Sequence, residues 1–332
     1  MDFISCVLRN FRCSDYSNPI QINNKDKSIF YLLYQDYELL NIANSYMYAN
    51  LYGVESLSYL QDHFICYKKN QNSIYNKMER RVIVNNIFSE CQLFSSSLWF
   101  IKDNAVTPYI ASICSDSNIE PEMLRRNVYY TNSLGNYDTV EFSHEELNEV
   151  MKWYSILEEF LFKKKSDSID MSNNLNNMSN YISFNIPSFQ RAFYYLDNAR
   201  RSDFLPAKIA SYISILETIF AANGENTQKV AERTAYFIGE SIDERISIYY
   251  DVKSIYDIRS CYVHGSLISD KKHQIIPEIS EKADNLVRRV LKKAYNEYPQ
   301  LNYMNKKDKN NHNSMNNIEV DRWFNELILR KE

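Results

Sequence analysis

The spacing of apolar residues divides the chain into a first part with a mixed pattern and a second part with a regular helical one. Between residues 80 and 101, apolar residues recur every three or four positions, which predicts a helix. Residues 28–53 are rich in apolar and aromatic residues, and their pattern fits either one long helix or a strand followed by a helix. Residues 125–142 place β-branched and aromatic residues around a Leu-Gly-Asn turn, which predicts a short hairpin or a loop.

The second part begins with a helix-capping signal. Ser143 is followed three residues later by Glu146, and this capping box precedes an amphipathic helix. Beyond an asparagine-rich loop, the apolar spacing predicts further helices at 187–201, 204–222, 226–238, 243–264 and about 277–297. A polar linker then leads to a short terminal helix, in which we expect Trp323 and Leu327 to be buried.

The composition favours a mainly α-helical protein. The 332 residues include only 5 Gly and 7 Pro, which argues against an all-β sandwich and against a glycine-rich nucleotide fold. We therefore predict an accessory or sensing region of mixed α/β structure at 1–140. We predict a helical bundle at 143–301, followed by the polar linker and short helix at 302–332.

Charge and cysteine content limit the partners and the compartment that we expect for this protein. The net charge of −4 gives no overall attraction to nucleic acid or membrane, so a site for a polyanion must be local. No run of eighteen apolar residues and no signal peptide are evident, and the six cysteines are scattered, so we expect a cytoplasmic protein with free thiols and no membrane contact. We expect no cofactor and no metal, although a zinc site that includes His63 and Cys66 is an alternative.

The segment YDIRSCYVHGS, residues 256–266, carries the candidate chemistry. Arg259 and His264 are five residues apart, so an ideal helix would point them in different directions, but a helix end at Gly265 would let both face one space. The negative end of the helix dipole favours a protonated histidine there. An arginine can bind a phosphate and a histidine can transfer a proton, which suits phosphodiester cleavage without metal. The spacing alone fits a surface arginine and a helix-capping histidine better than a catalytic pair.

Glu217 is a second candidate, because it places a carboxylate at the edge of an apolar helical stripe. Such a group either reaches water or pairs with a cation. Arg233 and Arg259 are the two arginines that we consider as its partner, and a carboxylate that holds Arg259 would position it.

Several motifs in one order resemble a known family. FQRAFYYLDNARRSDFLPAKIASYISILETIF, VAERTAYFIG and IYDIRSCYVHGS resemble the HEPN superfamily, and within it the ApeA-like HEPN domain. The resemblance covers roughly residues 140–300 and includes the helix that begins at Ser143. It does not extend to the first 130 residues.

The resemblance implies a helical bundle that forms a homodimer, with two Arg/His motifs facing one cleft. It implies a metal-independent endoribonuclease, of the kind that acts as a toxin or an anti-phage effector. Arg259 and His264 would be the catalytic pair, and Glu217 would be the helix glutamate of the family, with Arg233 as a further supporting residue. Ser260 stands where active members often carry Asn, Asp or His, so it is both a supporting residue and a departure from the pattern.

Other residues near the motif are candidates for RNA contact. Tyr256 and Tyr262 could stack on bases, and Lys271 and Lys272 could extend a phosphate-binding rim or form a solvated turn. The expected partners are an RNA substrate, a second copy of the chain, and a phage or host protein recognised by the N-terminal region. The alternative function is a non-catalytic HEPN dimer that binds RNA or protein.

Overall fold

The chain folds as two compact units. The computed structural model describes residues 2–14, 20–24, 27–34, 63–70, 77–115, 122–162, 187–220, 226–266, 269–302 and 316–329. Unit 1 comprises residues 1–132 and 137–177, and unit 2 comprises residues 133–136 and 178–332. A short loop of four residues is thus separated in sequence from the rest of unit 2.

Unit 1 is built on an antiparallel sheet. Among the described residues its strands are β1 (Asp2–Arg9), β2 (Phe11–Cys13), β3 (Ile20–Asn24), β4 (Lys27–Leu33), β5 (Phe64–Asn70), β6 (Thr107–Ser115), β7 (Glu122–Arg125) and β8 (Val140–Phe142). Six of these form a sheet in the order β3-β4-β5-β1-β6-β7, and β2 pairs in parallel with β8. The strand β1 pairs with β5 on one edge and with β6 on the other, and α4 packs against it, so that its apolar residues Cys6, Val7 and Leu8 are almost fully buried.

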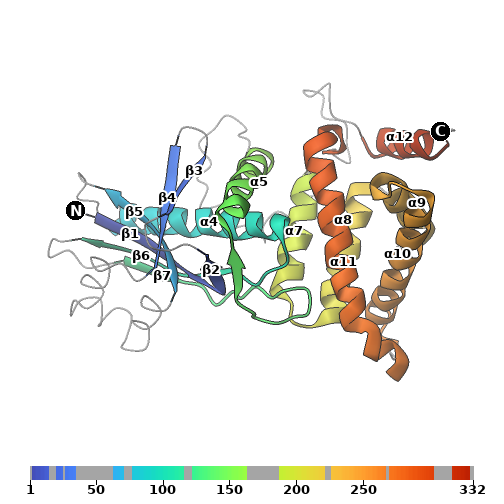
Figure 1. The fold of residues 1–332 in the computed structure, drawn as a ribbon, viewed down its shortest axis with the longest axis horizontal. Coiled ribbons are helices and arrows are strands. Elements are labelled where there is room, and N and C mark those ends of the chain that lie inside the picture. The colour runs from blue at the N-terminus through green and yellow to red at the C-terminus, as the bar shows by residue number, and fades with distance from the viewer. Residues whose placement is uncertain are drawn as a thin grey trace. The chain divides into compact units, whose positions relative to one another are not determined.

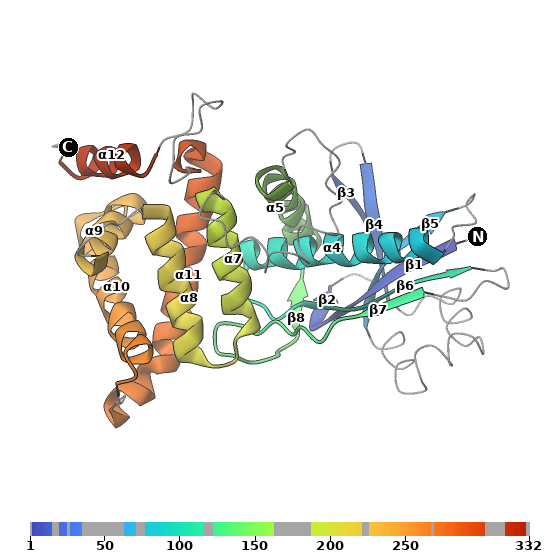
Figure 2. The ribbon, with the colours of Figure 1, turned by 180° about the vertical axis from the view of Figure 1, so that it is seen from behind.

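Two helices complete the described part of unit 1. The long helix α4 (Lys77–Ile101) runs along the sheet, and α5 (His144–Phe162) packs against α4 (Figures 1 and 2). The buried Arg80 of α4 donates a hydrogen bond to the carbonyl of Ile113 in β6. The rings of Phe100 and Trp153 stack with centroids 4.6 Å apart, which joins the two helices.

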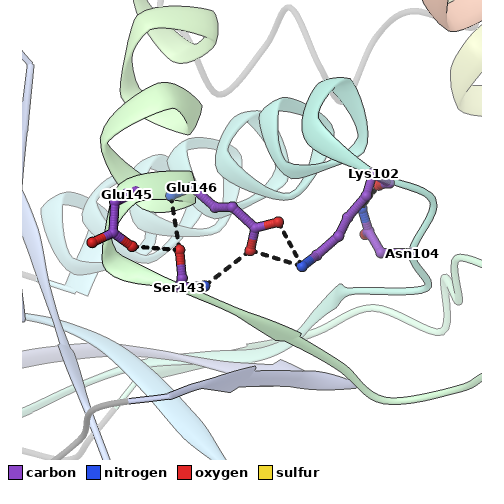
Figure 3. A network of polar contacts seen from close by, with 5 residues as sticks. All are labelled: Lys102, Asn104, Ser143, Glu145 and Glu146. Atoms are coloured by element: carbon purple, nitrogen blue, oxygen red, sulfur yellow. Dashed lines mark hydrogen bonds and ion pairs between the residues drawn. The ribbon is translucent and has the colours of Figure 1, made fainter.

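The predicted capping box begins α5 (Figure 3). The Ser143 amide donates to Glu146 Oε2 at 2.9 Å, and the Glu146 amide donates to Ser143 Oγ at 3.2 Å. Lys102, just beyond α4, donates to both Glu146 carboxylate oxygens at 2.7 Å. Burial opposes ionisation of Glu146, but the Lys102 ammonium and the Ser143 amide outweigh it and lower its pKa.

Unit 2 is a bundle of helices. They are α7 (Ser188–Arg201), α8 (Leu205–Phe220), α9 (Asn226–Ile238), α10 (Ile242–Val263), α11 (Asp270–Glu297), the short 3-10 helix η2 (Pro299–Leu301) and α12 (Asn317–Leu329). Helices α7, α8, α10 and α11 lie side by side, and α12 lies across the end of the bundle next to α9 (Figures 1 and 2). Apolar residues at helical spacing, such as Ile213, Val252 and Val290, are fully buried between them.

The structure therefore confirms a mainly α-helical chain with an N-terminal region of mixed α/β structure. Unit 1 extends further than the predicted boundary between 140 and 143, because α5 packs on α4 and not within the bundle. Residues 27–33 form a strand, and the remainder of the uncertain segment up to 53 lies almost entirely outside the described residues. The segment 126–139 is an irregular connection and forms no hairpin.

Three details of unit 2 differ from the sequence-based expectations. Helix α11 begins at Asp270, capped by Ser269, and Pro277 lies inside it and not at its start. The sequence predicts that Gly239 ends α9 with a left-handed backbone, but its backbone is not left-handed; an added Cβ there would lie 2.6 Å from the carbonyl of Ala235 and 2.6 Å from Arg245 Cγ, so close packing requires the glycine. Helix α12 buries Val320 and Phe324, whereas the predicted Trp323 and Leu327 are only half-buried.

Within the described ranges, no helix combines the length and apolar character needed to cross a membrane. In the described part of the chain, Cys6, Cys66, Cys91 and Cys261 form no disulfide, which agrees with the free thiols that the scattered cysteine spacing predicts.

Candidate functional site

The candidate motif occupies the last turns and the end of α10. Ser241 caps the start of this helix by accepting a hydrogen bond from the Glu244 amide at 3.2 Å. At the other end, Gly265 has a φ of +66°, its amide donates to the Tyr262 carbonyl, and the Ser266 amide donates to the Cys261 carbonyl at 3.0 Å. This pair of hydrogen bonds is a Schellman motif, and the left-handed backbone that it needs explains the glycine.

Arg259 lies beside two residues that fix its surroundings. Its Nη2 is 3.9 Å from Oε1 of Glu217 on α8, and Tyr256, one turn earlier on α10, donates its hydroxyl to the same Oε1 at 3.0 Å. The Arg259 side chain is 30% exposed and the Glu217 side chain is 22% exposed. Of the two partners considered for Glu217, the structure thus selects Arg259.

Tyr256 acts as a hydrogen-bond donor and not as a stacking surface. Its side chain is only 5% exposed, so no base can lie on its ring. Burial raises the pKa of the Tyr256 phenol far above its usual value, and the charge of Glu217 and the hydrogen bond to it raise the pKa further. The phenol therefore stays protonated and continues to donate to Glu217. The sequence placed Tyr256 near the motif but predicted the wrong role.

His264 and Ser260 reach solvent. His264 is the capping residue of α10, and its amide donates to the Ser260 carbonyl at 3.0 Å. Both side chains are exposed, and within the described ranges neither makes a hydrogen bond or an ion pair. On an ideal helix, five residues separate Arg259 and His264 by about 140° around the axis and about 7.5 Å along it. Within one chain, no hydrogen bond joins the two described side chains.

Arg233 does not belong to this site. Its side chain is 1% exposed, donates to the Phe220 carbonyl at 2.7 Å, and pairs with Asp321 on α12 at 2.5 Å. A further hydrogen bond joins it to Asn325 at 3.1 Å. Arg233 therefore fixes α12 to α8 and α9, and the predicted supporting role beside Glu217 is not what the structure shows.

The remaining RNA-contact candidates differ in how the structure places them. Tyr262 is 43% exposed and makes an edge contact with Phe204, which is 57% exposed. Lys271 and Lys272 lie in the first turn of α11 and not in a turn between helices. The Lys272 amide donates to Ser269 Oγ at 3.5 Å, and the Lys271 side chain lies outside the described part.

Phe204 is the residue that the sequence analysis missed. Its position between an aspartate and the Leu-Pro start of α8 looks like an ordinary turn. The signal that could have identified it is the aromatic ring itself, since a large apolar side chain is unusual in a short polar turn between helices.

The arrangement offers a guanidinium with donors left for an anion, and an imidazole that is exposed to solvent. In the described residues, no group of three or more His, Cys, Asp or Glu side chains is placed to hold a metal ion. His63 and Cys66, the residues of the alternative zinc site, do not belong to such a group among the described residues. Comparison of the chain with protein-family models, with curated proteins and with solved structures found no match.

Proposed function

We propose that this protein is a metal-independent endoribonuclease of the HEPN type, acting in phage defence or as a toxin. The observation that carries the proposal is that Arg259 and His264 have different surroundings. Arg259 is held beside Glu217 by a long ion pair, and His264 is exposed with no partner among the described residues. A cation that is positioned but not saturated suits a transient anionic ligand.

The chemistry follows from these two side chains. Arg259 binds the scissile phosphate and stabilises the negative charge that builds up on its oxygens. The ribose 2′-oxygen attacks phosphorus and loses its proton to a base, while the bond to the 5′-oxygen breaks and that oxygen gains a proton. His264 carries out one of these proton transfers. The products are a 2′,3′-cyclic phosphate and a 5′-hydroxyl, and no metal takes part.

Glu217 and Tyr256 are positioning residues in this scheme. The Tyr256 hydroxyl holds the carboxylate of Glu217, and that carboxylate orients the Arg259 guanidinium at 3.9 Å. A bidentate ion pair would occupy the donors of Arg259, whereas the observed contact leaves most of them available for phosphate. Ser260, exposed between Arg259 and His264 in sequence, has room to contact the RNA.

A second copy of the chain completes the site in this proposal, since no hydrogen bond joins Arg259 and His264 within one chain. The outer face of α10 carries Ile242, Ile246 and Tyr250, which are 70%, 52% and 64% exposed. Apolar side chains repeated on one helix face are typical of surfaces that another protein covers. We expect a two-fold dimer in which Arg259 of one chain faces the imidazole contributed by the other.

The first test is cleavage of single-stranded RNA in EDTA. Wild type should cleave, and Arg259→Ala and His264→Ala should each slow cleavage at least about a hundredfold. The matched controls Arg322→Ala and His144→Ala remove an exposed arginine and an exposed histidine elsewhere, and should cleave like wild type. RNA binding without cleavage by all five proteins would instead indicate the non-catalytic binding module.

The second test asks whether the dimer shares its sites. A mixed dimer of Arg259→Ala and His264→Ala chains contains no intact pair within either chain, but one intact pair between the chains. Recovery of up to half of the wild-type activity on mixing supports the shared site. No recovery, with mixed dimers confirmed by native mass spectrometry, means that each chain uses its own pair.

A further inference from the structure

An exposed aromatic pair lies beside the motif. Phe204 precedes α8, and Tyr262 is in the last turn of α10; their ring centroids are 5.8 Å apart with an interplanar angle of 64°. Phe204 is 57% exposed and Tyr262 is 43% exposed. Two neighbouring aromatic rings with this exposure offer ring faces on which a planar ligand can stack.

The turn that carries Phe204 is rigid. The Phe204 carbonyl accepts hydrogen bonds from the amides of Ala207 and Lys208 and from the Ser202 hydroxyl, each at 3.1 Å. These three hydrogen bonds join the residue before the turn, Ser202, and the start of α8 to the same carbonyl. The ring is therefore held at the surface by its backbone.

The four-residue loop of unit 2 supports the same turn. Gly135 in this loop has a φ of +78°, and a Cβ added to it would lie 2.6 Å from the Asp203 carbonyl oxygen. The loop is in turn fixed to α11, since the Ser280 hydroxyl donates to the Ser133 carbonyl at 2.6 Å. Loop and turn thus pack backbone against backbone next to Phe204.

Tyr262 is placed next to the proposed phosphate site by helix geometry. It lies three residues after Arg259, and residues at this spacing are neighbours on a helix surface, with Cβ atoms about 5–6 Å apart. A ligand that places an anion on Arg259 and a planar apolar group on the adjacent rings fits both features. A nucleotide of an unpaired strand has this combination, whereas the bases of a duplex are already stacked and paired.

We propose that Phe204 and Tyr262 form a stacking surface for an unpaired base next to the phosphate bound by Arg259. This inference rests on the proposed nuclease function and specifies its substrate as single-stranded RNA. Stacking on every base has a similar energy, so the surface selects for strand state and not for one sequence.

The test uses full-length protein and a 2′-O-methyl RNA strand, which lacks the nucleophile and therefore reports binding alone. Fluorescence anisotropy should show that Phe204→Ala and Tyr262→Ala each bind the single strand about five- to a hundredfold more weakly. Phe204→Trp should bind like wild type. The control Tyr236→Ala removes a tyrosine of α9 that is 37% exposed and lies beside Arg245, near the start of α10. The affinity of this variant for the strand should be unchanged.

A direct readout separates stacking from an indirect effect on folding. The indole of Phe204→Trp should be quenched by the 2′-O-methyl strand and not by an abasic strand of equal length. Equal quenching by both strands, or unchanged affinity of a folded Phe204→Ala variant, would overturn the inference. A dimer that weakens in Phe204→Ala while RNA affinity stays constant would show that a second copy of the chain covers this surface, and would also overturn it.

Failure of the nuclease proposal is recognisable separately. A wild-type protein that does not cleave RNA in EDTA, but whose Phe204→Trp variant shows base-dependent quenching, retains the stacking surface without the reaction. If cleavage needs His264 but proceeds equally well in Phe204→Ala and Tyr262→Ala, the nuclease proposal stands and the proposed stacking surface is wrong.

Discussion

Two arginines of unit 2 differ in their burial and in their polar partners. Arg233 is 1% exposed and is saturated by the Phe220 carbonyl, Asp321 and Asn325. Arg259 is 30% exposed, and among the described residues its one ion pair is the 3.9 Å contact with Glu217. Both positions looked equally suitable as partners of Glu217 in the sequence.

The difference shows what each arginine can do. A buried guanidinium must have its donors satisfied, because the cost of removing the charge from water is otherwise not offset. Arg233 meets that requirement and is committed to packing. Arg259 remains partly hydrated, so a phosphate can replace water at its free donors with little loss, and the residue can serve a ligand.

The largest expected effect on stability comes from breaking the saturated pair. Asp321→Ala leaves the buried Arg233 without its counter-ion, and we expect the free energy of unfolding to fall by about 3–5 kcal/mol. Urea unfolding followed by tryptophan fluorescence, to which Trp323 on α12 contributes together with Trp99 and Trp153, measures this loss.

The matched control for that variant is Asp197→Ala. It removes an exposed i,i+4 ion pair with Arg201, and such a pair contributes about 0.5 kcal/mol or less. Equal losses in Asp321→Ala and Asp197→Ala would contradict the structural role assigned to Arg233.

Tyr256→Phe tests how Arg259 is kept available. Loss of the hydroxyl removes a hydrogen bond to a carboxylate, and we expect the free energy of unfolding to fall by about 1–2 kcal/mol. Without Tyr256, Glu217 is free to pair more closely with Arg259 and to compete with the RNA phosphate. The KM for single-stranded RNA should therefore rise several-fold with a smaller change in kcat.

Steady-state kinetics of Tyr256→Phe, of Glu217→Gln and of the double variant test whether Glu217 competes with the RNA phosphate for Arg259. The Gln variant has no charge with which to compete, so the double variant should lose the rise in KM. A KM that stays at the wild-type value in Tyr256→Phe would show that the hydroxyl serves stability alone.

The sequence predicted the helices of unit 2 well because their apolar residues repeat at helical spacing and their ends carry capping signals. The glycine after His264 is such a local signal in unit 2, Ser143 with Glu146 is another in unit 1, and the structure shows both as expected. The choice between Arg233 and Arg259 could not be made from sequence, since it depends on where α12 packs.

The boundary between the units could not be predicted from the sequence either. The helix that begins at Ser143 has an apolar face that suits either unit, and only its contact with α4 assigns it to unit 1. Phe204 was missed for a related reason: the exposure of an aromatic ring depends on the loop at Gly135, which lies almost seventy residues earlier in the chain.

A smaller effect is expected when Arg259 itself is removed. Arg259→Ala should change the free energy of unfolding by only about 0.2–1 kcal/mol, because its ion pair is long and partly exposed. The same variant should lose cleavage almost completely, so stability and activity separate at this residue. A destabilisation as large as that of Asp321→Ala would place Arg259 with Arg233 as a packing residue.

The smallest effect concerns the ion pair of unit 1, which has short contacts but is exposed. Lys102 lies 2.7 Å from both carboxylate oxygens of Glu146, yet the two side chains are 36% and 30% exposed, so Glu146→Gln should cost about 0.5 kcal/mol at pH 7. The pKa of Glu146 is lowered in the folded state, so its contribution is complete above the unfolded value near 4.5 and disappears as the pH falls through the folded value. Urea midpoints of wild type and Glu146→Gln should therefore differ at pH 7 and converge below pH 4.5. A difference that persists at low pH would mean that hydrogen bonding in the capping box, and not the charge of Glu146, stabilises this end of α5.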